Sequence, residues 1–216
     1  FTVMNPTSQK ILKFNQKYGM FLLGSSSFSR KLILEQNQIS FRVISPNIDE
    51  KSIGDRSFGS DPINLVTNVA AAKTDAILRS KLPELSSHRI LITADQVVTQ
   101  KGRILEKPNN IEEARQFITG YSESSCSTVG CLVLTDLQSN RKVVGVDSAT
   151  IHFGQIPSNT IEQLLHEEAC LQCAGGLMVE HKLIQPFIKS IEGTQDSLMG
   201  LSLRLLSDLL EKLFTE

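Results

Sequence analysis

The sequence has little cysteine, almost no net charge and no long apolar run. Four cysteines in 216 residues are too few for a disulfide framework and are typical of reduced thiols in an intracellular protein. A net charge of −1 gives no general attraction to nucleic acid or to an anionic membrane, because both require a basic surplus. No apolar stretch approaches the roughly 20 residues that a membrane span needs. We therefore expect a cytoplasmic globular protein without a nucleic-acid or membrane partner.

Several common catalytic motifs are also missing. The glycine–lysine spacing of a P-loop is absent, and the four histidines show no metal-ligand spacing. Cys170 and Cys173 have the spacing of a metal or redox motif, but Cys126 and Cys131 lie five residues apart in an expected strand and so point to opposite faces. The chain begins without the charged-then-apolar layout of a signal peptide, and its start at Phe1 leaves open a longer targeting segment upstream.

What the sequence does contain is concentrated in the stretch Arg89–Pro108. Its apolar run Ile90–Ala94 predicts a buried strand that ends at Asp95. Ligands of open α/β sheets bind at the carboxyl ends of strands, so this carboxylate is a candidate site residue. A turn at residues 101–102 predicts a hairpin that brings Lys107 back near Asp95. An acid and a base would then flank one cleft.

A serine-rich turn near the start of the chain predicts a second part of this cleft. The apolar run Tyr18–Gly24 reads as a strand, and Ser25–Ser29 lead into a helix that carries Arg30 and Lys31 near its start. Free N–H groups and the helix dipole attract anions at such a terminus. The alternative is an ordinary serine N-cap with both cations in solvent.

Two further candidates depend on where the chain places them. A helix begins at Asp61 and Pro62, and its Lys73 falls on the apolar stripe four residues before Ile77. A lysine there must reach solvent along its stem or meet an anion inside the molecule. The adjacent acids Asp49 and Glu50 follow an expected strand, and they are of interest only if they face the acid at the end of the apolar run.

The remaining elements complete an α/β pattern. We expect a mixed twisted sheet flanked by helices, with two lobes and a central cleft, in one domain over residues 1–216 with residues 1–17 as an N-terminal extension and 18–216 as the catalytic part. The expected elements are a strand over Ile39–Ile44, a helix from Ile111 to about Ile118 that Gly120 closes, a strand to Leu134, a strand over Arg141–Phe153, a helix from Pro157, a short strand over Leu177–Glu180 and a final helix over Leu198–Leu213.

These motifs together resemble the Maf family of nucleoside triphosphate pyrophosphatases, relatives of the inosine triphosphatase fold. The likeness runs from about Phe21 to Leu213. It rests on the serine turn, the acid pair, the helix lysine and four short motifs: Ala94–Val98, Glu106–Pro108, Cys173–Gly175 and Gly200–Leu201. Each motif alone is weak, but their common order is specific.

The resemblance implies hydrolysis between the α and β phosphates, with a homodimer as the assembly. It implies that Glu50 and Asp95 hold a divalent cation, Mg²⁺ with Mn²⁺ or Co²⁺ as alternatives, and that Asp95 also activates the attacking water. The implied phosphate-binding residues are Ser25, Ser27, Arg30, Lys73 and Lys107.

The resemblance also implies a substrate class. Gln96 and Glu180 are similar to the base-selecting residues of the 7-methyl-GTP branch, because a carboxylate can accept from two donors on a guanine edge. Three departures bear on this interpretation: Phe28 replaces a proline, Ser29 replaces a base-contacting Arg or Trp, and Glu106 replaces a glycine. The alternatives are a pyrimidine (dTTP or UTP) pyrophosphatase and a non-catalytic nucleotide-binding protein linked to cell-division arrest.

Overall fold

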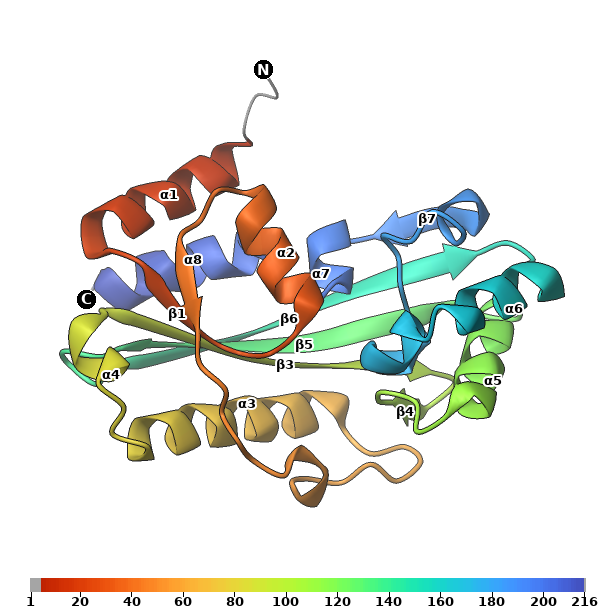
Figure 1. The fold of residues 1–216 in the computed structure, drawn as a ribbon, viewed down its shortest axis with the longest axis horizontal. Coiled ribbons are helices and arrows are strands. Elements are labelled where there is room, and N and C mark those ends of the chain that lie inside the picture. Colours follow the sequence, from red (N-terminus) through yellow and green to blue (C-terminus); the bar gives the residue numbers. More distant parts are fainter. Residues whose placement is uncertain (1–4, 216) are drawn as a thin grey trace.

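The structure, a computed structural model, describes residues 5–215 and contains one mixed seven-stranded sheet with strand order β2-β1-β3-β5-β6-β7, while β4 pairs with β3 (Figure 1). The strands are β1 Phe21–Gly24, β2 Phe41–Val43, β3 Ile90–Gln100, β4 Arg103–Leu105, β5 Cys126–Asp136, β6 Lys142–Phe153 and β7 Ile188–Glu192. The helices are α1 Pro6–Tyr18, α2 Phe28–Gln36, α3 Pro62–Arg79, α4 Glu84–Ser87, α5 Ile111–Tyr121, α6 Ser158–His166, α7 Gln195–Leu198 and α8 Leu203–Phe214. Short 3₁₀ turns are η1 Glu50–Ser52, η2 Ala169–Gln172, η3 Ala174–Gly176 and η4 Gln185–Phe187.

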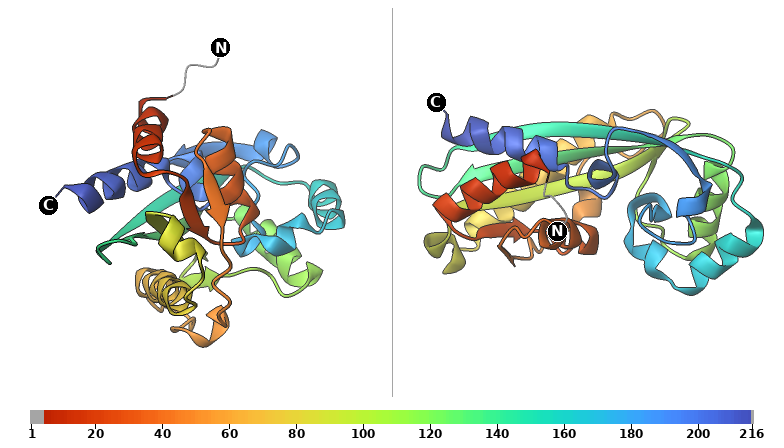
Figure 2. Two further views of the ribbon diagram at one scale, coloured as in Figure 1. Left: turned by 60° about the vertical axis from the view of Figure 1, so that its left-hand side comes forward. Right: turned by 90° about the horizontal axis from the view of Figure 1, so that it is seen from above.

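Helices cover both faces of the sheet, which confirms the predicted α/β architecture. Helices α1, α2 and α8 pack on one face over β3 and β5, and α3 packs on the other (Figure 1). Strands β3, β5 and β6 extend into a second lobe, where α5, α6 and the 3₁₀ turns η2, η3 and η4 gather around a separate apolar cluster (Figure 2). Strand β1 pairs in parallel with β2 and β3, whereas β3 pairs antiparallel with β5.

Helix α3 begins as the sequence predicts. Asp61 is its N-cap, accepting from the backbone N–H of Ile63, and Pro62 occupies the first helical position. Helix α5 likewise starts after Asn110, whose side chain accepts from Glu113. The prediction that Gly120 closes α5 was wrong, because the helix continues to Tyr121.

The prediction that the strand ends at Asp95 was also wrong. Strand β3 runs on to Gln100, because β5 pairs with it along nearly its whole length. The strand that ends is its parallel neighbour, since the last β1–β3 pair is Gly24 with Thr93. Asp95 therefore lies just past the carboxyl end of β1, where the edge of β3 is uncovered on that side. This position still suits a ligand site.

Two late elements differ from the sequence prediction. Leu177–Glu180 do not form a strand: Gly175 and Gly176, both with φ +62°, turn the chain just before them, and Val179 packs into the second-lobe core. The final helix starts at Leu203 rather than Leu198, because Gly200, with φ +101°, breaks the chain direction.

The stretch expected to be an extension contains a packed helix, α1. Its Ile11 is fully buried in the same apolar cluster as α8, and the Tyr18 and Phe214 rings stack with centroids 4.0 Å apart. The start of the chain does not have the layout of a signal peptide. Most of that segment, residues 1–4, lies outside the described residues. Within residues 5–215, none of the helices has both the length and the apolar content for a membrane crossing.

Candidate active site

A central cleft of ≈ 580 Å³ lies beside Asp95, between the two lobes. It is bounded by the serine turn after β1, the loop that carries η1, helix α3, strand β3, the segment after β4 and the η2–η3 region. The cleft is lined by each residue to which the resemblance gives a role, whereas Lys31, the second cation of the helix start, is not part of its lining; the lining residues are Ser25, Ser27, Arg30, Glu50, Lys73, Asp95, Gln96, Lys107 and Glu180. The chain thus brings together groups that are up to 155 residues apart in sequence (180 − 25).

Lys73 joins the two acids at the centre of the cleft. Its ammonium donates to Asp95 Oδ1 over 2.8 Å and lies 2.9 Å from Glu50 Oε2. The Lys73 side chain is only 5% exposed, so it meets an anion inside the molecule rather than reaching solvent. Of the adjacent acid pair, Glu50 faces this centre, whereas Asp49 accepts from the backbone N–H of Lys51 and caps η1.

Burial dominates the electrostatics of Asp95. Loss of solvent, the largest effect, raises the pKa of Asp95, and the nearby charges of Lys73 and Arg30 oppose it without cancelling it. A carboxyl group with a raised pKa binds a proton more readily than an ordinary aspartate. That property is useful in a group that receives a proton from water.

Arg30 is buried too, but neutral acceptors hold it. Its Nε donates to Gly200 O over 2.9 Å, and its Nη1 donates to Ser25 Oγ over 3.0 Å and to Ala94 O over 3.2 Å. Burial, the largest effect, lowers the pKa of Arg30, while the charges of the two central acids raise it. Ala94 O also accepts from Lys73 over 3.3 Å, so both cations converge on one backbone carbonyl. The alternative of a solvated Arg30 is therefore excluded.

The β3–β4 hairpin brings Lys107 to the cleft, as predicted. Its neighbour Glu106 does not stand alone beside the cations, because its carboxylate lies 2.7 Å from Nε of Arg56. Arg56 was missed from the sequence. The one available signal was the unusual acid at position 106, which requires a cationic partner when it is partly buried.

Gln96 has less freedom than the base-reading hypothesis assumes. Its amide nitrogen donates to the backbone carbonyls of Ser197 and Leu198 over 2.8 and 3.3 Å. Gln96 therefore anchors the segment before Gly200, and only its Oε1 is left to face a ligand. Glu180 lines the cleft, and its charge adds to the burial that raises the pKa of the Cys173 thiol to about 11. That thiol is protonated at neutral pH and is a poor nucleophile.

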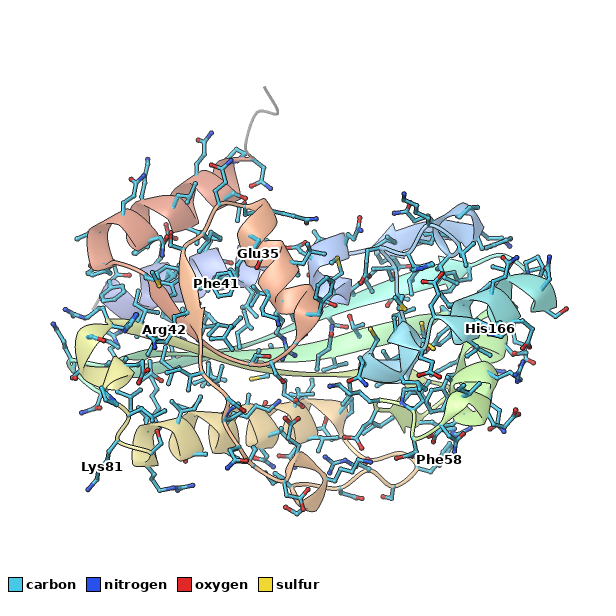
Figure 3. All side chains as sticks on the ribbon, viewed as in Figure 1. Glu35, Phe41, Arg42, Phe58, Lys81 and His166 are labelled. Carbon is cyan, nitrogen blue, oxygen red and sulfur yellow. The ribbon has the colours of Figure 1, made fainter. Side chains whose placement is uncertain are left out.

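A second hollow, here called the apolar groove, continues from the central cleft and has a volume of ≈ 1350 Å³. The two share Lys107, Glu180 and the serine turn. Apolar side chains in the groove include Phe28 and Met178, and His166 (labelled in Figure 3) contributes to its second-lobe wall. The combined space therefore has a charged half and a mainly apolar half.

The central acids fit a hard divalent cation. Glu50 and Asp95 each give one oxygen to Lys73, and their other carboxylate oxygens are ligands of the type that Mg²⁺ prefers. Residues 5–215 contain no cluster of three or more His, Cys, Asp and Glu side chains that could hold a metal alone. Mg²⁺ often binds through one or two carboxylates plus substrate phosphates, which suits this donor set.

Comparison with known proteins assigns the family. A family model described as "Maf-like protein" matches residues 20–213. The chain belongs to the Maf family. This Maf chain is 34% identical over 194 residues to the 7-methyl-GTP pyrophosphatase of Dictyostelium discoideum, covering 88% of this chain and 95% of that protein.

Other relatives carry different substrate names. The dTTP/UTP pyrophosphatase of Chlamydia trachomatis serovar L2 is 32% identical over 191 residues, covering 88% of this Maf chain and 91% of that protein. The nucleoside triphosphate pyrophosphatase of Chlamydia muridarum is 32% identical over 192 residues, with the same two coverages. The solved Staphylococcus aureus Ham1 protein overlaps with a TM-score of 0.36 at 11% identity, covering 62% of this chain and 72% of that one.

Proposed function

We propose that this protein hydrolyses a nucleoside triphosphate between its α and β phosphates, giving a nucleoside monophosphate and pyrophosphate. The observation that carries the proposal is the union of a charged cleft with an apolar groove. Arg30, Lys73 and Lys107 match a triphosphate, and the groove matches a base. The pyrophosphatase names of the Maf relatives support the same reaction.

In the proposed step, Asp95 accepts a proton from water as the water oxygen bonds to the α phosphorus. The bond from that phosphorus to the bridging oxygen breaks, and its electron pair leaves on pyrophosphate. Arg30, Lys73 and Lys107 stabilise the charge that develops there. Ser25 and Ser27 offer further hydrogen-bond donors. Glu50 and Asp95 would hold the divalent cation, which supplies Lewis-acid polarisation of the phosphates when bound.

We assign 7-methyl-GTP as the preferred substrate. The support is Glu180 at the junction of cleft and groove, where a carboxylate can accept from N1–H and the exocyclic amine of a guanine. The relative named for 7-methyl-GTP points the same way. A dTTP or UTP preference is the alternative, favoured by the name of the Chlamydia trachomatis relative. Binding of a base that offers no donors to this carboxylate would leave it unpaired, at a cost on the order of 1–3 kcal/mol, and the site would therefore reject that base.

A substrate panel tests this proposal. Purified protein with Mg²⁺ is given 7-methyl-GTP, GTP, UTP and dTTP, and ion chromatography identifies the products. We expect nucleoside monophosphate and pyrophosphate in equal amounts, fastest from 7-methyl-GTP. Release of inorganic phosphate with a nucleoside diphosphate would contradict the reaction. Faster turnover of UTP or dTTP would contradict only the substrate assignment, and tight binding without product would favour the non-catalytic alternative.

We also propose a homodimer, from the family resemblance, and a cytoplasmic location, from the cysteine content of the chain. Light scattering coupled to size exclusion measures the mass directly, and we expect about twice the 23.9 kDa of the chain. A mass equal to one chain at micromolar concentration would contradict the dimer. Imaging of a tagged full-length protein tests the location.

A further inference from the structure

Two loops face each other across the central cleft, and each carries one candidate site residue. The first runs from β2 through η1 to α3 and holds Glu50, and the second follows β4 and holds Lys107. Two contacts join the loops: they lie on either side of Lys107 in the sequence and both follow Glu50. Lys51 Nζ donates to Asn109 Oδ1 over 2.9 Å. The second contact is the ion pair between residues 56 and 106 at 2.7 Å.

Arg56 also fixes the backbone of the first loop. Its Nη2 donates to Glu50 O over 2.8 Å, and its Nη1 donates to Ile53 O. The loop needs such an anchor, because η1 is only three residues long and none of them is buried. The Glu50 side chain is 46% exposed, and Ile53, directly after η1, packs against the apolar cluster of α3. The guanidinium of Arg56 thus supports this loop together with that apolar contact.

Glu106 fixes the opposite loop. Its backbone carbonyl accepts from Gly175 N over 2.8 Å, which ties the Lys107 segment to η3. Its carboxylate is ion-paired with Arg56, although the Nε–H of that guanidinium makes no hydrogen bond, so the charge of Glu106 is compensated by this guanidinium. The pair is sheltered, with side chains 20% and 32% exposed. The Lys101–Glu123 pair near the same hairpin is 58% and 64% exposed, the kind that contributes little.

We propose that Arg56 and Glu106 are positioning residues that hold Glu50 and Lys107 at a fixed separation across the cleft. The expected effect on turnover rests on the proposed function. The Arg56–Glu106 ion pair, here called the clasp, is a property of the fold and does not depend on that function. Glu50 is a candidate metal ligand, so loosening its loop weakens the binding of the cation that accompanies the triphosphate. Glu106, which stands where the family has a glycine, therefore has a positioning role in this site and does not indicate that the site has lost its activity.

The test compares four variants with a matched control: Arg56→Ala, Glu106→Ala, the double alanine variant and the charge swap Arg56→Glu/Glu106→Arg. The control is Lys101→Ala/Glu123→Ala. The first readout is the Mg²⁺ concentration for half-maximal pyrophosphate release. We expect about a tenfold rise in Glu106→Ala, the coupling typical of contacting residues, and a larger rise in Arg56→Ala, which also loses its two donations to backbone carbonyls. We expect the double variant to match Arg56→Ala. The swap restores the ion pair but not those donations, so we expect it to fall between the double variant and wild type, and the control to match wild type.

The second readout is hydrogen exchange of backbone amides in residues 49–56, which does not depend on activity. We expect faster exchange in both single variants and unchanged exchange in the control. Activity that increases in Glu106→Ala, or exchange unchanged in both single variants, would overturn the proposal. Failure of wild-type protein to hydrolyse any triphosphate would refute the proposed function, and the exchange comparison would still decide on the clasp.

Discussion

Replacing Lys73 should destabilise the fold more than replacing Asp95, although the two residues form one ion pair. Lys73→Met leaves the Asp95 carboxylate, whose side chain is 11% exposed, without its nearest cation. Breaking a buried pair in this way costs about 3–5 kcal/mol. Asp95→Asn leaves the ammonium with Glu50 at 2.9 Å and with a backbone carbonyl at 3.3 Å. Loss of one charged hydrogen bond then costs about 1–3 kcal/mol.

The double variant Lys73→Met/Asp95→Asn sharpens this comparison. It removes the buried Asp95 carboxylate together with its nearest cation, and the buried Arg30 keeps its neutral acceptors. We therefore expect it to be more stable than Lys73→Met alone even though it carries one more substitution. Urea unfolding at pH 7, followed by circular dichroism, gives the free energy of unfolding for each protein from the midpoint and slope. Equal losses in the two single variants, or a double variant whose loss is the sum of both, would refute the reasoning.

Two further predictions concern Asp136 and Tyr121, which do not line the central cleft. Asp136 accepts a bidentate pair from Arg89; burial, the largest effect, raises its pKa, but its hydrogen bonds together outweigh burial and lower it. Because its pKa is lowered in the folded protein, Asp136 stabilises the fold at pH values above the ordinary aspartate pKa, and this stabilisation is lost as pH falls through the folded pKa. Asp136→Asn should therefore lower the free energy of unfolding by about 1–3 kcal/mol at pH 7 and by progressively less below about pH 4, measured by urea unfolding at each pH. A difference that stays constant with pH would contradict this. Tyr121→Phe removes a 2.6 Å hydrogen bond to Gly175 O and should lower stability by about 1 kcal/mol in thermal unfolding, whereas no loss would show that the bond is dispensable.

The sequence was informative where a regular period constrains the side chain. Lys73 falls on the apolar stripe of α3, so its burial and its need for an internal anion follow from the helical repeat. The cap of α3 follows from Asp61 in the same way. The prediction that Asp95 lies at the end of a strand and borders a cleft was right about the cleft but wrong about which strand ends. The apolar run marks a strand, but no local pattern shows that β1 ends while β3 continues.

Contacts between distant loops could not be predicted. Arg56 and Glu106 are 50 residues apart (106 − 56), in segments without periodicity, and only the folded chain shows that they meet. The same holds for Gln96, whose amide is occupied by backbone carbonyls about 100 residues later. Short segments with two glycines, such as the one before Leu177, give an apolar pattern that resembles a strand while their backbone turns away.

The most direct test of the account is the amount of pyrophosphate released from 7-methyl-GTP by wild type and by Asp95→Asn. Asp208→Asn, at an exposed position on α8, serves as the matched control. Loss of a positioned general base lowers the rate by about 10²–10⁴-fold. We predict that wild type and the control release one pyrophosphate per monophosphate while Asp95→Asn, still folded, loses at least a hundredfold in rate. Undiminished release by folded Asp95→Asn would contradict the account.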